Sequence, residues 1–98
     1  MEPPVKLLTT EELQRALSSL EGWERDGDAW ITRTLTFADF DEAMDFIVRL
    51  ADVARALDHH PNLSNVYNRV ELRLQTHDAG GVTSRDVAFA ERANALLS

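Results

Sequence analysis

All three histidines of this 98-residue chain lie between positions 59 and 77. His59 and His60 are adjacent and stand directly before Pro61, whereas His77 follows a run of alternating polar and apolar residues. An imidazole is the side chain that ordinarily gains or loses a proton near neutral pH. Histidines that converge on one pocket could therefore act as both general acids and general bases. We predict that the adjacent pair and the single histidine form two sides of one pocket.

The backbone around the adjacent histidines is restricted by Pro61. Proline has no N–H and holds the preceding residue near an extended conformation, so a helix must end before this point. Apolar residues at helical intervals predict a long helix that follows residues 37–39 and ends near Leu57, with Asp39 or Asp41 as its N-terminal cap. The histidine pair is thus expected directly after a long amphipathic helix, with Asp58 at the junction.

The third histidine is expected at the end of a strand. Apolar and polar residues alternate over positions 70–77, which is the period of a strand with one buried face. A shorter strand over 62–67 and a tight turn at Asn68-Arg69 would precede it. His77 would then close the longer strand on its polar face.

Two further helices are indicated by their N-terminal residues. Thr9 is followed three residues later by Glu12, and Thr83 by Asp86, which is the spacing of a reciprocal cap. The first helix is expected to stop at Gly22. Asp86 is therefore interpreted first as a helix cap.

A hairpin is predicted over residues 23–37, with its turn at Asp26-Gly27. The full order of elements is then α-β-β-α-β-β-α. Two hairpins can join into one four-stranded antiparallel sheet, and three amphipathic helices would pack on one face of it. We predict an α+β two-layer fold in a single domain over residues 9–98, preceded by a mobile segment over residues 1–8.

The composition narrows the classes of function. The formal net charge is −7 at pH 7, which argues against direct binding to nucleic acids and anionic membranes, because both need a basic face. There is no cysteine, so a thiol nucleophile and a disulfide framework are excluded. No apolar stretch approaches the roughly 20 residues of a spanning helix, and the N-terminus lacks the features of a signal peptide. We expect a cytoplasmic protein.

Each candidate residue also has a structural interpretation that the sequence leaves open. Asp58 could simply end the preceding helix, and the histidine pair could be polar residues at a helix terminus. His77 alone would ordinarily be a solvent-facing strand residue, and Thr76 would pack on the buried face. A zinc site with three histidine ligands is a competing interpretation, but adjacent histidines in extended backbone point apart, which disfavours it.

The chain resembles the pterin-4a-carbinolamine dehydratases. The residues that carry the resemblance are His59-His60-Pro61, Tyr67 six positions after the proline, His77 ten positions after the tyrosine, and Asp86. With matching positions elsewhere, the resemblance covers roughly residues 10–98. Two positions depart from the family pattern: Arg55 replaces a common acidic residue, and Leu63 replaces a common tryptophan. The second change removes an aromatic wall for the flat pterin ring, so weaker substrate binding is expected.

The resemblance implies an enzyme that removes water from a 4a-hydroxytetrahydropterin and yields the quinonoid dihydropterin. No metal and no organic cofactor are implied. By the same resemblance, His59 and His77 act as acids at the leaving hydroxyl. His60 is implied to bind the substrate and to act as the base.

Three further residues are implied to bind the substrate or to orient the histidines. Asp58 could accept an imidazole N–H and so select a tautomer, and the backbone around Thr76 could meet the amide edge of the pterin. Asp86 recurs in the family pattern and is a third candidate.

The resemblance also implies partners. Members of the family form dimers or tetramers, and their substrate is made by aromatic amino-acid hydroxylases. A homodimer or homotetramer, with a hydroxylase as a pathway partner, is therefore expected. The alternative function is a non-catalytic protein-binding or assembly factor on the same scaffold, because some relatives act as dimerisation cofactors for a transcription factor.

Overall fold

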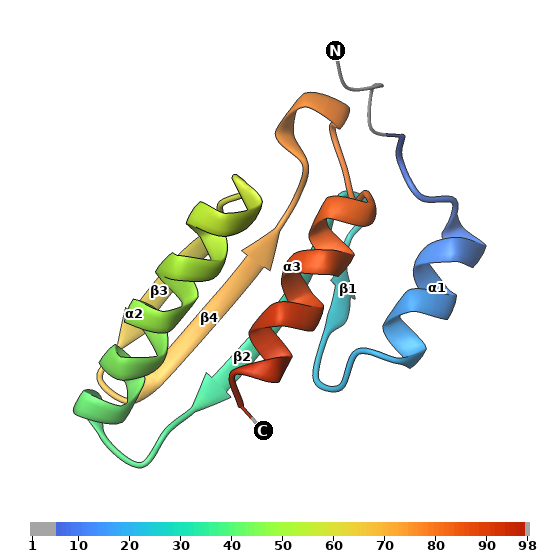
Figure 1. Ribbon diagram of the computed structural model, residues 1–98. Helices are drawn as coiled ribbons and strands as arrows, with labels where there is room; N and C mark the ends of the chain where they lie inside the picture. Colours follow the sequence, from blue (N-terminus) through green and yellow to red (C-terminus); the bar gives the residue numbers. More distant parts are fainter. Residues whose placement is uncertain (1–5, 98) are drawn as a thin grey trace.

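The computed structural model describes residues 6–97 of the chain. Within this range the helices and strands follow one another in the predicted order (Figure 1). Their bounds are α1 Thr10–Ser18, β1 Glu24–Asp26, β2 Trp30–Thr36, α2 Phe40–Leu57, β3 Asn62–Val66, β4 Arg69–Leu74, the 3-10 helix η1 His77–Ala79, and α3 Ser84–Ala95.

One antiparallel sheet contains the four strands in the order β1-β2-β4-β3. β4 therefore lies inside the sheet, and its register with β2 runs from Leu74 opposite Ile31 to Arg69 opposite Thr36. α2 and α3 lie across one face of the sheet, and α1 lies on the side of the β1 edge (Figure 1). The predicted α+β fold with an antiparallel sheet is confirmed.

The alternation along β4 decides which of its residues form the core. Val70, Leu72 and Leu74 are fully buried, whereas the polar residues between them point away from the helices. Leu50 of α2 and Phe89 of α3 are buried in the same core. Burying one side chain of this size contributes about 1.5–3 kcal/mol. This packing holds both helices against the central strand.

All three α-helices begin at capping residues that the sequence indicated. Thr9 and Glu12 form a reciprocal pair of hydrogen bonds, as do Thr83 and Asp86. Asp39 caps α2 with its side chain. A cap of this kind contributes about 1 kcal/mol.

The prediction that the longer strand reaches His77 is wrong. β4 ends at Leu74. The carbonyl of Thr76 accepts hydrogen bonds from the N–H groups of Ala79 and Gly80, both at 3.0 Å, and these bonds close the chain into η1. A local turn therefore replaces the last part of the predicted strand, and His77 lies on that turn.

The predicted turn at Asn68-Arg69 is shifted by one residue. Val66 pairs with Arg69, so the turn consists of Tyr67 and Asn68. Tyr67 has a φ of 51°, which is unusual for a residue with a side chain. The side chain of Asn65 donates to the carbonyl of Tyr67 at 3.1 Å and helps to hold this conformation.

Two boundaries at the first hairpin also differ. α1 ends at Ser18 instead of Gly22, and Trp23 precedes β1 instead of opening it. Gly22 has a φ of +82°, and a Cβ atom there would lie 2.5 Å from Nε of Arg33. Gly22 is therefore needed for a turn under an arginine side chain, not for the end of the helix.

The start of the described chain is joined to the domain. The N–H of Leu8 donates to the carbonyl of Val82 at 2.9 Å, and Leu7 forms an isolated bridge with Thr83. The predicted mobile segment covered residues 1–8. Residues 1–5 of that segment lie outside the described residues. Among residues 6–97, no helix combines the length and the apolar character that crossing a membrane requires.

Candidate active site

A cleft of about 260 Å³ opens where three segments of the chain meet. These segments are the loop after α2, the turn after β4, and the first turn of α3. The residues that line the cleft are Asp58, His59, His60, Gln75, Thr76, His77, Asp78 and Arg85. The predicted convergence of the three histidines on one space is confirmed by this geometry, and their catalytic roles remain predictions.

The end of α2 gives the adjacent histidines different environments. Asp58 is the C-terminal cap of α2 and has a left-handed φ of 48°. The N–H of His59 still donates to the carbonyl of Ala54, so this residue stays close to the helix. His59 is 9% exposed, whereas His60 is exposed. One imidazole therefore forms the inner wall of the cleft and the other its rim.

Asp86 holds the buried imidazole. Its Oδ1 lies 2.6 Å from Nε2 of His59, and Asp86 itself is fully buried. We predicted an orienting carboxylate at Asp58, but the carboxylate on His59 is that of Asp86. Because Asp86 also caps α3, the cap and the site residue are the same side chain.

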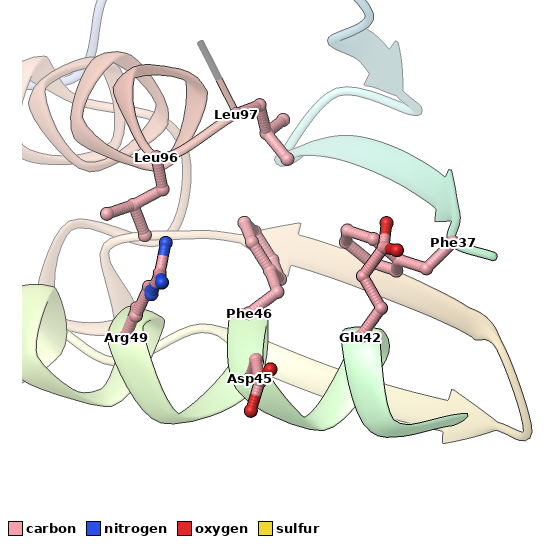
Figure 2. Close-up of a pocket in the computed structure, with 7 residues that line it drawn as sticks. All are labelled: Phe37, Glu42, Asp45, Phe46, Arg49, Leu96 and Leu97. Carbon is pink, nitrogen blue, oxygen red and sulfur yellow. The ribbon is translucent and has the colours of Figure 1, made fainter. Parts of the chain in front are cut away.

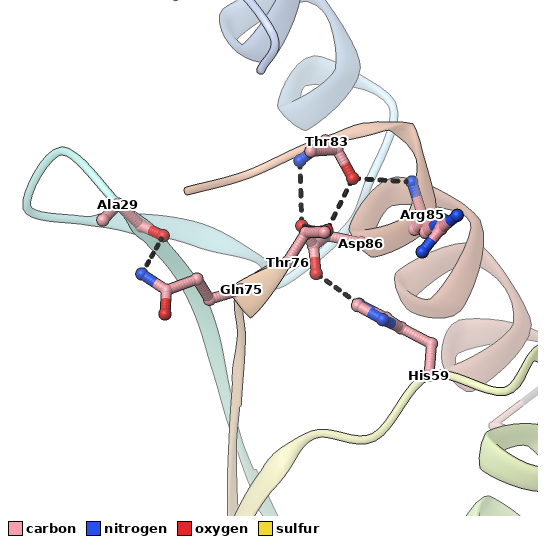
Figure 3. A network of polar contacts seen from close by, with 7 residues as sticks. All are labelled: Ala29, His59, Gln75, Thr76, Thr83, Arg85 and Asp86. Atoms are coloured by element: carbon pink, nitrogen blue, oxygen red, sulfur yellow. Dashed lines mark hydrogen bonds and ion pairs between the residues drawn. The ribbon is translucent and has the colours of Figure 1, made fainter. Parts of the chain in front are cut away.

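Two threonines complete the surroundings of Asp86 (Figure 3). Oδ2 of Asp86 accepts the hydroxyl of Thr76 and the backbone N–H of Thr83, both at 2.8 Å. The two threonine hydroxyls lie 2.6 Å apart. No buried side-chain nitrogen or oxygen in residues 6–97 lacks a partner. Thr76 thus takes part in the site through its side chain, as one member of a fully paired buried network.

His60 and His77 form the open side of the cleft. Both are exposed, and neither imidazole is hydrogen-bonded to another residue in the described part of the chain. Asp58, Asp78 and Arg85 are also exposed residues that line the cleft, and together they carry both signs of charge. A ligand in the cleft would therefore meet two accessible imidazoles, both signs of charge and the inner wall formed by His59.

Gln75, Asp78 and Arg85 line the cleft but were not predicted. Each is next to a predicted site residue in the sequence, and this adjacency was the only available signal. The side chain of Gln75 donates to the carbonyl of Ala29 at 3.3 Å, so it ties the turn after β4 to the start of β2.

The two departures from the family pattern lie outside the cleft. Arg55 is exposed and forms an ion pair with Asp52 at 2.8 Å. Leu63 lies on β3 and is 39% exposed. Neither side chain lines the cleft.

Residues 6–97 contain no set of side chains arranged as ligands for the competing zinc site. No group of three or more histidine, cysteine, aspartate or glutamate side chains in this range is arranged to hold a metal ion. The buried His59 uses its Nε2 on Asp86, and His60 lies on the rim. The three imidazoles line one space without forming a common coordination centre.

A second cleft of about 240 Å³ lies beside the N-terminal half of α2 (Figure 2). Its lining residues are Phe37, Glu42, Asp45, Phe46, Arg49, Leu96 and Leu97. Two phenylalanine rings and two leucines form its apolar walls, and no imidazole lines it. Of the two, only the histidine-lined cleft offers groups suited to proton transfer near neutral pH.

Residues 6–96 match the family described as pterin 4 alpha carbinolamine dehydratase. A protein of Afipia carboxidovorans is 52% identical over 93 residues, which cover 94% of this chain and 93% of that protein. A protein of Koribacter versatilis is 52% identical over 91 residues, which cover 93% of this chain and 96% of that protein. Both relatives carry pterin-4-alpha-carbinolamine dehydratase as a provisional name.

Two solved structures are similar. The transcriptional coactivator/pterin dehydratase from Brucella melitensis is 43% identical, with a TM-score of 0.89 over 93% of this chain and 98% of that one. A pterin dehydratase-like protein described as a RuBisCO assembly factor of the alpha-carboxysome is 23% identical, with a TM-score of 0.67 over 78% of this chain and 89% of that one. The second likeness is one of fold alone. By its sequence and its fold, this chain belongs to the pterin 4 alpha carbinolamine dehydratase family.

Proposed function

We propose that this protein dehydrates 4a-hydroxytetrahydropterin to the quinonoid dihydropterin, as a step in the recycling of tetrahydropterin in the cytoplasm. The observation that carries the proposal is the meeting of His59, His60 and His77 in one cleft. Membership of a family described by this reaction supports it. A hydroxylase that makes the carbinolamine would be the pathway partner.

The reaction requires one proton at the leaving hydroxyl and the removal of one proton from a ring nitrogen. The C4a–O bond breaks, its electron pair leaves with the oxygen as water, and the lone pair of the ring nitrogen forms the new C=N bond. Imidazoles can serve at both points near neutral pH. We assign the acid role to His59 and His77, and the base role, together with substrate binding, to His60.

The other cleft residues would bind the polar edge of the pterin. Carboxylates such as Asp58 and Asp78 can accept its N–H groups, and a guanidinium such as that of Arg85 can donate to its carbonyl. The backbone around Thr76 would meet the amide edge. These contacts would position the C4a hydroxyl among the three imidazoles.

The test is the rate at which chemically or enzymatically generated 4a-hydroxytetrahydropterin disappears. Adding the protein should accelerate this loss, with a bell-shaped dependence on pH. His60→Ala and His77→Ala should each lower the rate at least about tenfold, as loss of a general acid or base usually does. Arg49→Gln, in the second cleft, is the matched control. If both histidine variants kept the full rate, the proposal would fail.

Exposed apolar side chains favour a second candidate function, which is binding to another protein chain. On the β3 side of the sheet, Leu63, Val66 and Tyr67 are 39%, 65% and 62% exposed. On α2, Phe40 and Val48 are 44% and 66% exposed. β3 is also an edge strand, whose free backbone groups can pair with another strand. We propose a homodimer or homotetramer formed through these surfaces.

Light scattering at micromolar concentration tests the oligomer. Val66→Lys on the edge strand and Val48→Glu on α2 should each lower the measured mass if their surface is an interface. A monomeric wild-type protein would contradict the oligomer. A protein-binding role without catalysis would be favoured by a stable partner together with dehydration no faster than background.

A further inference from the structure

The donors around Asp86 decide where each proton of the buried network lies. Thr76 has one hydroxyl proton, and it donates that proton to Oδ2 of Asp86. The proton in the 2.6 Å contact between the two threonine hydroxyls must therefore belong to Thr83. The backbone N–H of Thr83 can only donate, and its acceptor is the same Oδ2. Oδ2 of Asp86 thus accepts two hydrogen bonds and carries no proton.

The remaining oxygen of Asp86 decides the tautomer of His59. Oδ1 lies 2.6 Å from Nε2, so one proton is shared between these two atoms. An imidazole is ordinarily a much stronger base than a carboxylate, so the shared proton belongs to the imidazole. Nε2 of His59 is therefore the donor, and Nδ1 is the only ring nitrogen left for another partner.

Nδ1 of His59 is accessible to a ligand. In residues 6–97, every buried side-chain nitrogen or oxygen has a partner, and no partner of Nδ1 lies in this part of the chain. Nδ1 must therefore belong to the exposed part of the side chain, which is 10% of its surface. Because His59 lines the cleft, this exposed nitrogen is the atom that a bound substrate can reach.

We propose that Asp86 is a positioning residue that keeps a proton on Nε2 of His59, so that His59 exchanges protons with the substrate only through Nδ1. The proposal rests on the proposed dehydration and adds the atom and the tautomer to it. In the doubly protonated imidazole, Nδ1–H gives its proton to the leaving hydroxyl, the C4a–O bond breaks, and water departs with the electron pair. His59 is left neutral, with its proton on Nε2. Nδ1 is then protonated again from solvent or by His60, which has taken the proton of the ring nitrogen.

The same network does not reach the other two imidazoles. His60 and His77 are exposed and have no hydrogen-bonded side-chain partner in the described residues, so either ring nitrogen of each can meet the substrate. Among contacts within residues 6–97, only that of His59 therefore determines the tautomer of an imidazole. This difference predicts that a change at Asp86 acts on one histidine and leaves the other two unchanged.

Asp86→Asn is the decisive substitution because it should reverse the direction of the hydrogen bond between this side chain and Nε2 of His59. The backbone N–H of Thr83 must still find an acceptor, so the amide oxygen of the new side chain takes the position of Oδ2. The amide NH₂ then faces Nε2 of His59, which has to become an acceptor. The proton of neutral His59 moves to Nδ1, and the doubly protonated form is disfavoured because two N–H groups would face each other.

Nitrogen NMR of the imidazoles reads this tautomer directly. With three histidines in the chain, signals are assigned by removing His60 and His77 in turn. Neutral His59 should carry its proton on Nε2 in the wild-type protein and on Nδ1 in Asp86→Asn, while Arg49→Gln resembles the wild type. A proton on Nδ1 in the wild-type protein, or an unchanged tautomer in Asp86→Asn, would overturn the proposal. The wild-type spectrum decides the matter even if the variant fails to fold.

Kinetics separate this proposal from the proposed function. Asp86→Asn should lower kcat by roughly 10²-fold, because the doubly protonated His59 that donates to the leaving hydroxyl is disfavoured. The change in KM should be smaller, because the other residues that line the cleft are kept. If the tautomers are as expected but the wild-type protein does not accelerate dehydration, the proposed function fails and the positioning of His59 stands. If dehydration is fast and Asp86→Asn keeps the wild-type kcat, proton exchange through Nδ1 is refuted while the function stands.

Discussion

Two clefts of similar volume lie along α2, and they differ in what supports them. The histidine-lined cleft, of about 260 Å³, lies beyond the C-terminal end of the helix and rests on the buried carboxylate of Asp86. The cleft of about 240 Å³ beside the N-terminal half rests on Phe37 and Phe46, whose ring centroids are 5.2 Å apart (Figure 2). Volume therefore does not distinguish them, whereas the polar groups beneath them do.

This difference indicates that the residues of the second cleft mainly stabilise the fold, whereas those of the histidine-lined cleft are arranged for proton transfer. Beneath the first cleft, each donor and acceptor of the network has a partner, so an imidazole is held in one orientation. The second cleft is lined by charged side chains as well as by two phenylalanines and two leucines, and the contacts among the apolar side chains stabilise the fold. Substitutions in the two clefts should therefore separate stability from rate.

The largest effect on stability is expected in the second cleft. Phe46→Ala should lower the free energy of unfolding by about 3–5 kcal/mol, because a side chain that is 5% exposed would leave a cavity. The dehydration rate per folded molecule should not change. Urea unfolding and a rate assay on the folded fraction measure the two quantities. A loss of rate per folded molecule would break the proposed separation of the clefts.

Thr76→Val should affect both quantities. It removes the hydroxyl that donates to Asp86 and leaves the hydroxyl of Thr83 without its acceptor, at a cost of roughly 1–3 kcal/mol. The rate should fall as well, since Asp86 and His59 lose part of their support. Unfolding and rate assays on one preparation provide the check, and an unchanged stability would show that the network is not needed.

A smaller effect, which depends on pH, is expected in α1, a helix that lines neither cleft. Hydrogen bonds from the backbone and the side chain of Thr9 lower the pKa of Glu12. A lowered pKa means that this carboxylate stabilises the fold above its ordinary pKa, and that the contribution is lost as the pH falls through the lowered pKa. Glu12→Ala should thus be less stable than the wild type at neutral pH, and the gap should narrow on acidification. Unfolding curves between neutral and acidic pH test this, and a gap that widens with acid would contradict it.

The smallest effect is expected at the rim of the second cleft. Arg49 is exposed, so Arg49→Gln should change the free energy of unfolding by less than about 0.5 kcal/mol. Its dehydration rate should equal that of the wild type. A clear loss of rate would show that the second cleft contributes to catalysis, and the proposed difference between the two clefts would then be wrong.

Much of the fold could be predicted because the sequence patterns that indicate it involve residues only a few positions apart. The caps at Thr9 and Thr83 depend on residues three positions away, and the alternation along β4 identified Val70, Leu72 and Leu74 as core. One boundary that was predicted wrongly lies where backbone hydrogen bonds compete. At Thr76, the bonds to η1 end the strand, and nothing in the alternating pattern signals that competition.

The sequence predicted which residues form the candidate site more fully than it predicted the contacts between them. The histidine types and their spacing identified His59, His60 and His77, and all three line the cleft. The carboxylate that selects the tautomer of an imidazole was sought at Asp58, next to the pair, whereas Asp86 was a candidate only because it recurs in the family pattern. Gln75, Asp78 and Arg85 were missed because single polar residues that are not fully buried carry no pattern of their own.

By itself the sequence determined the element order, the helix caps, the buried faces and the histidines, because each depends on residue types a few positions apart. Only the tertiary structure decided that Asp86 meets His59, a residue 27 positions earlier, and that His77 reaches the cleft from a turn instead of a strand. The physical reason is that the core packs α2 and α3 against β4, and this packing brings together the ends of segments that have no local relation in the chain.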